Sequence, residues 1–294
     1  MRILHIDTGT EMRGGQLQVE LLLSGLTKAG HECRLLAPRG SPLSEAATKA
    51  GYAVRNAEAK EVFQESKHAA LVHAHDARAH TLAAIASRRR FVVSRRVAFA
   101  VRRSVASHWK YQRTTRFLAV SNFVAAQLQT AGVRKHKIDI VYDGVPSHPP
   151  AAPWNPNSPA VSLSTNDPQK GRDLVEAASA IAGVPVVFSR DLPRDLQTAS
   201  MFVYITRSEG LGSAALLAMN MGVPVIASAI GGLTEIFSRP ECGLLVPNDP
   251  PAIAQAMRRI LGDPTFAARM IAAAKARIAE SFTKEHLITG TLES

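Results

Sequence analysis

The sequence predicts an α/β protein made of two Rossmann-like domains, each built on a parallel sheet. A chain of 294 residues allows two domains, and short apolar runs alternate twice along it with stretches of helical periodicity. Between the two series, segment 147–159 places five prolines in thirteen residues, which no helix or central strand accepts. We therefore predict an N-terminal domain over 1–146, a linker over 147–159, a C-terminal domain over 160–275, and a C-terminal helix over 276–294 that could pack back on the N-terminal domain.

The first series of elements begins with a strand at 2–6. The helix after it carries an apolar stripe at i, i+3, i+4 and i+7 from Val19 to Leu26, and Gly30 ends it. Further strands are predicted at 33–37, 70–74, 91–94, 117–120 and 138–142, and further helices at 42–50, 77–87, 98–112 and 122–131.

The second series repeats this alternation after the proline-rich segment. Its strands are predicted at 160–164, 184–188, 201–205, 223–227 and 243–246, and its helices at 171–181, 193–199, 212–221, 250–261 and 264–281. Strands and helices in alternation favour right-handed βαβ units, whose ligands bind at the carboxyl ends of the strands. Two such halves are expected to enclose a cleft.

The charge of the chain is concentrated in one segment. Lys and Arg number 35 against 24 Asp and Glu, a net charge of +11. From Ala77 to Lys137 there are fourteen bases and no acid, so 21 bases face 24 acids elsewhere, a balance of −3. Such a balance predicts an anionic partner, and nucleic acid, an anionic membrane and phosphorylated small molecules all fit it.

The cysteines and the apolar runs bear on the compartment. Cys33 and Cys242 are too few for a disulfide framework or a cysteine-based zinc site. No run approaches 18 apolar residues, and the N-terminal apolar run is too short for a signal peptide. We expect a cytoplasmic protein that could contact the inner face of the cytoplasmic membrane.

A glycine-containing loop, Thr8–Gln16, follows the first predicted strand and holds Gly14 and Gly15. Backbone N–H groups and the positive end of a helix dipole at such a place favour a phosphate or another anion. The loop lacks the G-x-G-x-x-G fingerprint and the Gly-Lys-Ser/Thr of a P-loop. A plain glycine turn is the alternative.

Three histidines, His73, His75 and His80, lie around the end of the third predicted strand. A zinc site is disfavoured because His73 and His75 share a face only if the strand continues. His75 at the carboxyl end is a candidate hydrogen-bonding partner for a substrate. Packing and capping roles are the alternative.

The third candidate site lies in the second half. Lys170 opens the first helix there and could reach a diphosphate as a point charge. The carboxylate of Glu209 is followed directly by the predicted N terminus of a helix, at Gly210, Leu211, Gly212 and Ser213. A carboxylate accepts hydrogen bonds from hydroxyls while the helix N terminus attracts anionic oxygens, a combination suited to a nucleotide sugar. A glycine turn that caps a buried helix is the alternative.

Taken in order, these segments resemble the family 4 glycosyltransferases, retaining enzymes of the GT-B fold. The matching segments are the Gly14-Gly15 loop, His73-Ala-His75, Phe117–Ser121, Val141–Val145, Lys170-Gly171, Ser208–Gly212, and Gly222–Ala227 followed by Gly231-Gly232. The resemblance covers nearly the full length of the chain.

The resemblance implies transfer from a nucleoside diphosphate sugar to a glycan or lipid-linked acceptor of the lipopolysaccharide or cell-envelope type. It implies no metal and no cofactor, because a cationic side chain and a helix dipole take the charge of the leaving group. Glu209 and His75 are the catalytic candidates, with no protein nucleophile named. The donor-binding candidates are Gly14, Gly15, Arg95, Arg96, Lys170, Ser189, Arg190, Gly210, Leu211, Gly212 and Ser213.

The sequence departs from the family pattern at some donor contacts. The second glutamate of the family falls on Leu217, and the arginine that precedes the family's lysine falls on Ser164 or Thr165. Arg95 or Arg96, the latter in place of the family's cleft histidine, could restore the missing positive charge. A variant that binds its donor without turnover is therefore one alternative.

The segment between the predicted lysine and glutamate sites is about half as long as is usual in the family, so we predict a short variant with a reduced C-terminal sheet. The acceptor or membrane face is predicted at Arg88, Arg89, Arg90, Arg102, Arg103 and Lys110. Few aromatic residues are interleaved with these bases and no nucleic-acid-binding motif is present. A nucleic-acid partner is therefore the less favoured alternative.

Overall fold

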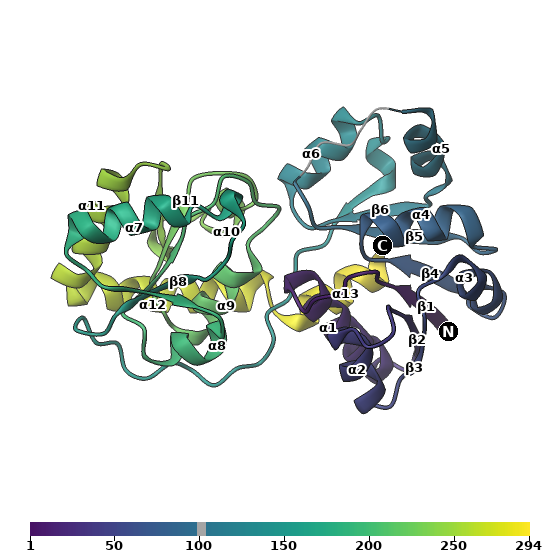
Figure 1. Cartoon of the computed structure of the whole chain (residues 1–294), viewed down its shortest axis with the longest axis horizontal. Helices are drawn as coiled ribbons and strands as arrows, with labels where there is room; N and C mark the ends of the chain where they lie inside the picture. Colours follow the sequence, from purple (N-terminus) through teal and green to yellow (C-terminus); the bar gives the residue numbers. More distant parts are fainter. Residues whose placement is uncertain (99–103) are drawn as a thin grey trace. The chain divides into compact units, whose positions relative to one another are not determined.

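The structure is a computed structural model that describes residues 1–98 and 104–294. The chain forms two compact units (Figure 1). Unit 1 combines Met1–Gly144 with Lys284–Ser294, and unit 2 is the continuous stretch Val145–Thr283. The segment that returns to unit 1 begins at Lys284 rather than at the predicted 276, because the helix before it runs uninterrupted from Pro264 to Ser281.

Unit 1 contains a parallel sheet of seven strands in the order β3-β2-β1-β4-β5-β6-β7. Its strands are β1 (Arg2–Ile6), β2 (Glu32–Leu36), β3 (Ala53–Arg55), β4 (Leu71–Ala74), β5 (Phe91–Arg95), β6 (Arg116–Ala119) and β7 (Ile138–Ile140). The central pair β1 and β4 places His5 opposite His73. Side chains of paired residues point to the same face of a sheet, so this register brings two histidines together.

The helices of unit 1 connect these strands in the βαβ pattern. They are α1 (Gly14–Lys28), α2 (Pro42–Lys49), α3 (Ala59–Ser66), α4 (Ala77–Ala86), α5 (Val105–Arg113), α6 (Asn122–Thr130), the short 3₁₀ helix η1 (Lys135–Lys137) and α13 (Lys284–Glu293). Helix α1 buries the stripe from Val19 to Leu26 that the sequence predicts. Helix α13 packs against α1, where a side chain on Gly25 would collide with Ile288.

Three elements of unit 1 depart from the prediction. Strand β3 and helix α3 have no counterpart in it, since β3 has three residues that are exposed or half-buried at the sheet edge and so carries no apolar run. The helix predicted at 98–112 begins at Val105. Arg102 and Arg103 of the predicted face lie outside the described residues.

Unit 2 contains a smaller parallel sheet in the order β12-β11-β10-β8-β9, so the five strands predicted for this half are confirmed. Its strands are β8 (Ala160–Leu163), β9 (Val186–Ser189), β10 (Met201–Tyr204), β11 (Val225–Ser228) and β12 (Leu244–Val246). Its helices are η2 (Pro168–Lys170), α7 (Arg172–Ala182), α8 (Leu192–Asp195), η3 (Leu196–Thr198), α9 (Ser213–Met221), α10 (Leu233–Ile236), η4 (Pro240–Cys242), α11 (Pro250–Gly262) and α12 (Pro264–Ser281).

The core of unit 2 lies where its sheet meets α7, α11 and α12, and its buried side chains include Met201, Val203 and Ile226 from the central strands β10 and β11. The proline-rich segment 147–159 forms no helix or strand and runs along this unit. The backbone N–H of Ala151 donates to the Met221 carbonyl at 2.8 Å, and Trp154 Nε1 donates to the Ser200 carbonyl at 2.7 Å.

No helix among the described residues combines the length and the apolar character needed to cross a membrane.

Candidate active site

The best-defined polar site of unit 2 lies at the carboxyl edge of its sheet, in the loops after β8 and β10. Lys170 ends the 3₁₀ helix η2, and Gly171 then turns the chain into α7 with a φ of +55°. A Cβ on Gly171 would lie 2.8 Å from a side-chain carbon of Ile205. The glycine therefore fixes both the turn and the close approach of Lys170 to the β10 loop that carries Glu209.

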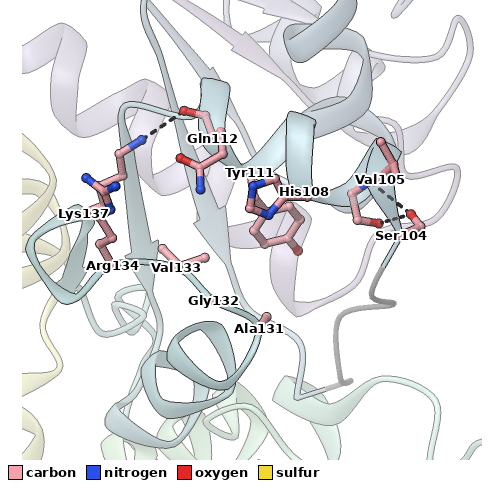
Figure 2. A pocket seen from close by; sticks show the side chains of 11 residues that line it. Ser104, Val105, His108, Tyr111, Gln112, Ala131, Gly132, Val133, Arg134 and Lys137 are labelled. Atoms are coloured by element: carbon pink, nitrogen blue, oxygen red, sulfur yellow. Dashed lines mark hydrogen bonds between the residues drawn. The ribbon is translucent and has the colours of Figure 1, made fainter.

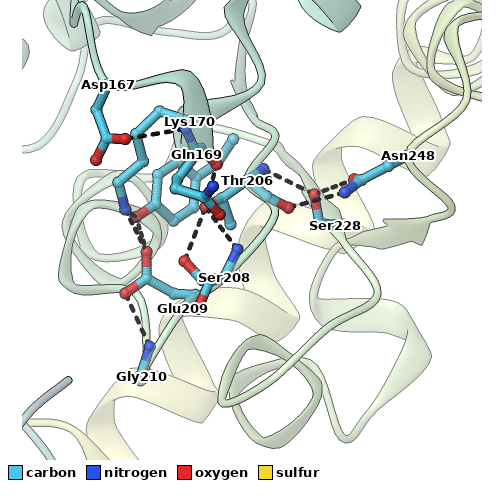
Figure 3. Close-up of polar contacts among 10 residues, drawn as sticks. Asp167, Gln169, Lys170, Thr206, Ser208, Glu209, Gly210, Ser228 and Asn248 are labelled. Atoms are coloured by element: carbon cyan, nitrogen blue, oxygen red, sulfur yellow. Dashed lines mark hydrogen bonds and ion pairs between the residues drawn. The ribbon is translucent and has the colours of Figure 1, made fainter. Parts of the chain in front are cut away.

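Lys170 and Glu209 (Figure 3) form a compact polar cluster with Tyr204. Lys170 Nζ donates to Glu209 Oε2 at 2.8 Å and to the Tyr204 hydroxyl at 3.3 Å. The Tyr204 hydroxyl donates to the same Oε2, and the backbone N–H of Gly210 donates to Oε1 at 3.1 Å. The two donor-site candidates that the sequence predicted in separate segments thus contact each other.

Tyr204 is the member of this cluster that sequence reasoning missed. It is the last residue of an apolar strand and is 4% exposed, so it reads as a core residue. Burial and the neighbouring Glu209 raise the pKa of its hydroxyl well above the ordinary value. The hydroxyl is therefore protonated at neutral pH and can donate to the carboxylate.

The N terminus of α9 follows the glutamate directly. Gly212 caps it with a φ of +119°, which favours glycine, and Leu211 is buried. Gly232 packs against this loop: its N–H donates to the Glu209 carbonyl at 3.2 Å, and a Cβ there would lie 2.7 Å from the Leu211 Cα. The loop 209–212 is thereby held at the positive end of the α9 dipole, where anionic groups are favoured.

A second hydrogen-bond network, which the sequence did not predict, joins the carboxyl ends of β10, β11 and β12 (Figure 3). The Thr206 N–H donates to Ser228 Oγ at 2.9 Å, and Ser228 Oγ donates to Asn248 Oδ1 at 2.6 Å. Asn248 Nδ2 returns to the Thr206 carbonyl at 2.9 Å. This closed ring fixes the start of the loop that carries Glu209.

Two predicted donor-binding residues, Ser189 and Arg190, lie at the same edge. Ser189 ends β9, and its carbonyl accepts a 2.8 Å hydrogen bond from the Ser164 N–H in the loop that leads to Lys170. The Ser189 hydroxyl is buried and, among the residues that the structure describes, finds no hydrogen-bond partner. Arg190 is exposed directly after it.

In unit 1 the glycine-containing loop closes on Asp7, the residue after β1. Gln16 Nε2 donates to both oxygens of Asp7 at 3.0 and 3.1 Å, and the Gly9 N–H donates to Oδ1 at 2.9 Å. Burial raises the pKa of Asp7 above its ordinary value, although these hydrogen bonds oppose the shift. Gly14 and Gly15 open α1, and a Cβ on Gly15 would meet no atom within 4 Å, so open space lies in front of it.

Asp76 ties the same loop to the next strand end. Its carboxylate accepts from the Thr8 N–H at 2.6 Å and the Thr8 hydroxyl at 2.7 Å. It also caps α4, accepting from the backbone N–H groups of Arg78 and Ala79. Asp7 and Asp76 were not predicted, although a carboxylate directly after a buried strand is a signal that could have found them.

The histidines at this edge form a buried cluster. His75 keeps the strand direction beyond β4, so His73 and His75 do share a face, with ring centroids 4.0 Å apart. His5 Nδ1 lies 2.9 Å from His75 Nε2, and His73 Nε2 lies 2.8 Å from Ser94 Oγ. Burial lowers the pKa of His75 well below its ordinary value, and His73, His5 and Arg96 add to the shift. All three rings are therefore neutral hydrogen-bonding groups at physiological pH.

The same cluster has enough nitrogen donors for a metal ion, because one ring nitrogen from each of His5, His73 and His75 lies within 4.8 Å of the others. Arg96 Nη1 approaches His75 Nδ1 at 3.5 Å, and its positive charge opposes a dication there. That the protein needs no metal stays a prediction. His80 lies apart from this cluster on α4, buried against Phe91 and Phe117.

The two arginines predicted at the donor site, Arg95 and Arg96, contact different residues. Arg96 Nε donates to Asp143 Oδ1 at 2.9 Å in a buried ion pair, next to His75. Arg95 lies close enough to Lys110 and Tyr111 to affect both: burial lowers the pKa of Lys110 and Arg95 adds to this shift, whereas burial raises the pKa of Tyr111 and Arg95 opposes it. Arg96 is therefore the one that the structure joins to the histidine cluster.

The predicted basic face is split between edges. Arg88, Arg89 and Arg90 precede β5 and lie at the amino edge of the sheet, opposite His75. Lys110 is half-buried and donates to Thr81 Oγ1 at 3.1 Å. Between α5 and the 131–137 segment lies a cavity of about 530 Å³, lined by Ser104, Val105, Ser107, His108, Tyr111, Gln112, Ala131, Gly132, Val133, Arg134 and Lys137 (Figure 2).

Two protein-family models match this chain and show the family to which it belongs. Residues 12–148 match the model for Glycosyltransferase Family 4, and residues 164–263 match the model for Glycosyl transferases group 1. The chain belongs to the family 4 glycosyltransferases. The fold agrees with this membership, since similar solved structures, among them a glycosyltransferase of Rickettsia africae, cover 99–100% of this chain.

HepE of Anabaena, solved in complex with UDP-glucose, gives a TM-score of 0.85 at 17% identity over 100% of this chain and 98% of its own. Sucrose-phosphate synthase of Thermosynechococcus elongatus gives 0.77 at 18% identity over 99% and 97%. In sequence, D-inositol 3-phosphate glycosyltransferase of Nocardioides sp. is 35% identical over 111 residues, 37% of this chain and 24% of the relative. The match thus spans about a quarter of that relative.

Proposed function

We propose that the protein transfers a sugar from a nucleoside diphosphate sugar to a glycan or lipid-linked acceptor of the lipopolysaccharide or cell-envelope type. The observation that carries the proposal is the cluster at the carboxyl edge of the unit 2 sheet. There, a lysine and a carboxylate lie together beside the N terminus of α9. HepE was solved with UDP-glucose, and WaaB is a lipopolysaccharide outer core galactosyltransferase whose structure resembles this chain with a TM-score of 0.70 at 14% identity.

Each group in the cluster has a role in this reaction. Lys170 and the positive end of α9 stabilise the charge that develops on the diphosphate leaving group. Glu209 accepts hydrogen bonds from hydroxyls of the transferred sugar. Ser189 and Arg190 are proposed to contact the base, Arg190 through its exposed side chain.

The acceptor is proposed to bind unit 1 at the edge that carries Asp7, His75 and the loop before α1. There His75 is a neutral imidazole that can hydrogen-bond an acceptor hydroxyl. Retention at the anomeric carbon and independence of metal ions are part of the same proposal, and they rest on the family resemblance. Proton NMR of the product tests the first, and unchanged turnover with a chelator tests the second.

We also propose a peripheral contact with anionic membrane through unit 1. Exposed apolar side chains stand among its bases: Ile85 is 64% and Trp109 46% exposed, and the Arg113 guanidinium stacks 5.4 Å from the Trp109 ring centroid. Arg88 lies similarly over Phe63. Apolar rings that insert at the headgroup level, surrounded by cations, are typical of surfaces that bind anionic lipid.

Glu209→Ala is the direct test of the transfer reaction. The variant is expected to lose sugar transfer by at least about 100-fold while it keeps its fold, because the loop is still held by Gly232 and by the Thr206 ring of hydrogen bonds. Glu176→Ala, which removes an exposed carboxylate from α7, is the matched control and should keep its activity. Wild-type turnover in Glu209→Ala would exclude the assigned role.

A thermal-shift screen over nucleotide sugars identifies the donor. Ligand that binds only the folded state raises the melting temperature by mass action, so the true donor should give a saturable shift. A shift with donor but no transfer would point to a binding protein without turnover. No shift with any donor, together with a salt-sensitive shift with oligonucleotides, would favour a nucleic-acid partner.

A further inference from the structure

The carboxylate of Glu209 receives two donors on one oxygen. Lys170 Nζ and the Tyr204 hydroxyl both donate to Oε2, while Oε1 accepts from the Gly210 N–H. The two donors differ in exposure and in the element that carries them. Lys170 is a long side chain on a three-residue 3₁₀ helix, 25% exposed, whereas Tyr204 is buried in the central strand β10.

The chemistry of donor binding requires Lys170 to change partners. In the structure its ammonium is paired with Glu209, and the proposed reaction uses the same ammonium to hold a diphosphate. The Glu209 side chain is only 15% exposed, so the departure of the ammonium carries a cost, because a largely desolvated charge that loses a donor is destabilised. The cluster must therefore contain a group that stays on Glu209 when Lys170 departs.

We propose that Tyr204 is a positioning residue that keeps the Glu209 carboxylate oriented and hydrogen-bonded while Lys170 exchanges from Glu209 to the anionic part of the donor. This inference rests on the proposed function for its substrate, but its mechanism requires only an anion that competes for Lys170. The donor site is then a two-state device in which Lys170 is shared between an internal carboxylate and a bound phosphate.

The surroundings of Tyr204 fit this role. Its ring stacks on Phe202 with centroids 5.5 Å apart and an interplanar angle of 17°, so the hydroxyl is fixed in direction. The strand and the Thr206 ring of hydrogen bonds hold the backbone on either side of Glu209. Burial and the adjacent carboxylate raise the pKa of Tyr204, so the hydroxyl remains a donor at all physiological pH values.

Removal of the hydroxyl has an unequal effect on the two states. With Lys170 on Glu209, Tyr204→Phe leaves the carboxylate with the lysine and the Gly210 N–H. With Lys170 on an anion, it leaves only the Gly210 N–H among the described contacts. The anion-bound state therefore suffers more, and anion affinity falls although Tyr204 does not touch the anion.

The test measures binding of inorganic pyrophosphate by calorimetry, which reports on Lys170 without a base or a sugar. Tyr204→Phe should weaken pyrophosphate binding by roughly tenfold, the size expected for loss of one charge-assisted hydrogen bond. Glu209→Gln should tighten it, because Lys170 is released from its ion pair. When Glu209→Gln or Lys170→Met is already present, adding Tyr204→Phe should not change the affinity for pyrophosphate further.

This dependence on background separates positioning from a general structural role. The proposal would be overturned if Tyr204→Phe weakened pyrophosphate binding equally in the wild type, Glu209→Gln and Lys170→Met. It would also be overturned if Tyr204→Phe did not weaken binding in the wild type. If Tyr204→Phe does not fold, the exchange is still testable: Glu209→Gln must bind pyrophosphate more tightly than wild type, and Lys170→Met must abolish most of that difference. Equal affinities in the wild type and Glu209→Gln would overturn it.

A parallel series with UDP-glucose separates this inference from the proposed function. Tyr204→Phe should raise the KM for the donor more than it lowers kcat, since the loss lies in the release of Lys170. If UDP-glucose and other nucleotide sugars fail to bind any variant while the pyrophosphate pattern holds, the proposed function is wrong and the exchange stands. If nucleotide sugars bind and Tyr204→Phe changes kcat alone, the exchange is wrong and the function stands.

Discussion

Gly232→Ala tests how tightly the Glu209 loop must be held. Gly232 has a φ of −66°, which any residue adopts, so alanine adds no backbone strain and the effect is purely steric. An added Cβ would lie 2.7 Å from the Leu211 Cα and would also collide with the Gly210 carbonyl oxygen. Both contacts are with backbone, so the 209–211 loop must move.

The size of the effect follows from these contacts. Ordinary carbon contacts begin at about 3.4 Å, so the loop is displaced by roughly 1 Å. Overpacking of this kind costs about 1–3 kcal/mol of folding free energy, and a displacement of about 1 Å near the reacting atoms can cost roughly 100-fold in rate. We expect kcat/KM for sugar transfer to fall by about 100-fold with a moderate loss of stability.

The assay pairs transfer kinetics with denaturant unfolding, and Gly262→Ala is the matched control. A Cβ at Gly262 meets no atom within 4 Å, and this residue ends α11. The control should be neutral or gain up to about 1 kcal/mol from the better helix propensity of alanine. A Gly232→Ala variant with the activity of Gly262→Ala would refute the reasoning.

Three further outcomes are expected. Burial lowers the pKa of His80 to about 3 from its ordinary 6.5, so the unfolded state binds this proton first and stability falls as pH drops from about 6.5 toward 3. His80→Gln should flatten that slope in urea titrations by up to about 1.4 kcal/mol per pH unit, and an unchanged slope would exclude His80 as its source. Gln18→Ala should cost about 2–4 kcal/mol in chemical unfolding, because Gln18 donates to the Gly144 carbonyl and accepts from its N–H, both at 2.9 Å inside unit 1; a loss below about 1 kcal/mol would contradict it. Arg88→Glu and Trp109→Ala should each weaken binding to anionic liposomes by roughly threefold to tenfold in sedimentation assays, and unchanged binding would count against the proposed membrane face.

The sequence predicted most of the fold because its signals are local. Buried strands such as 201–204 read as apolar runs, and the stripe from Val19 to Leu26 matches the period of a helix. Strand β3, which the sequence did not predict, lacks such a local signal. Strand β3 buries no residue fully, and it depends on hydrogen bonds to β2 rather than on an apolar pattern.

The site could be predicted from the sequence only where its charged residues lie in loops. Lys170 and Glu209 were found because charged residues beside glycines at strand ends have few structural reasons to be there. Tyr204 was missed because it ends a buried apolar strand and so reads as a core residue. Ser228 and Asn248 were missed because their hydrogen bonds cross between strands. Which of these residues become neighbours depends on the strand order β12-β11-β10, and no single segment of the sequence determines that order.

The return of α13 to unit 1 has a consequence for the order in which the chain can fold during synthesis. Unit 2 is continuous and can close as soon as Thr283 has left the ribosome. Unit 1 begins the chain, yet Leu287 of α13 belongs to its buried core together with Val19 and Leu23 of α1. The first unit to be translated is therefore the last to be completed. A nonsense mutation shortly after Thr283 would leave unit 1 without α13 and expose it to proteolysis.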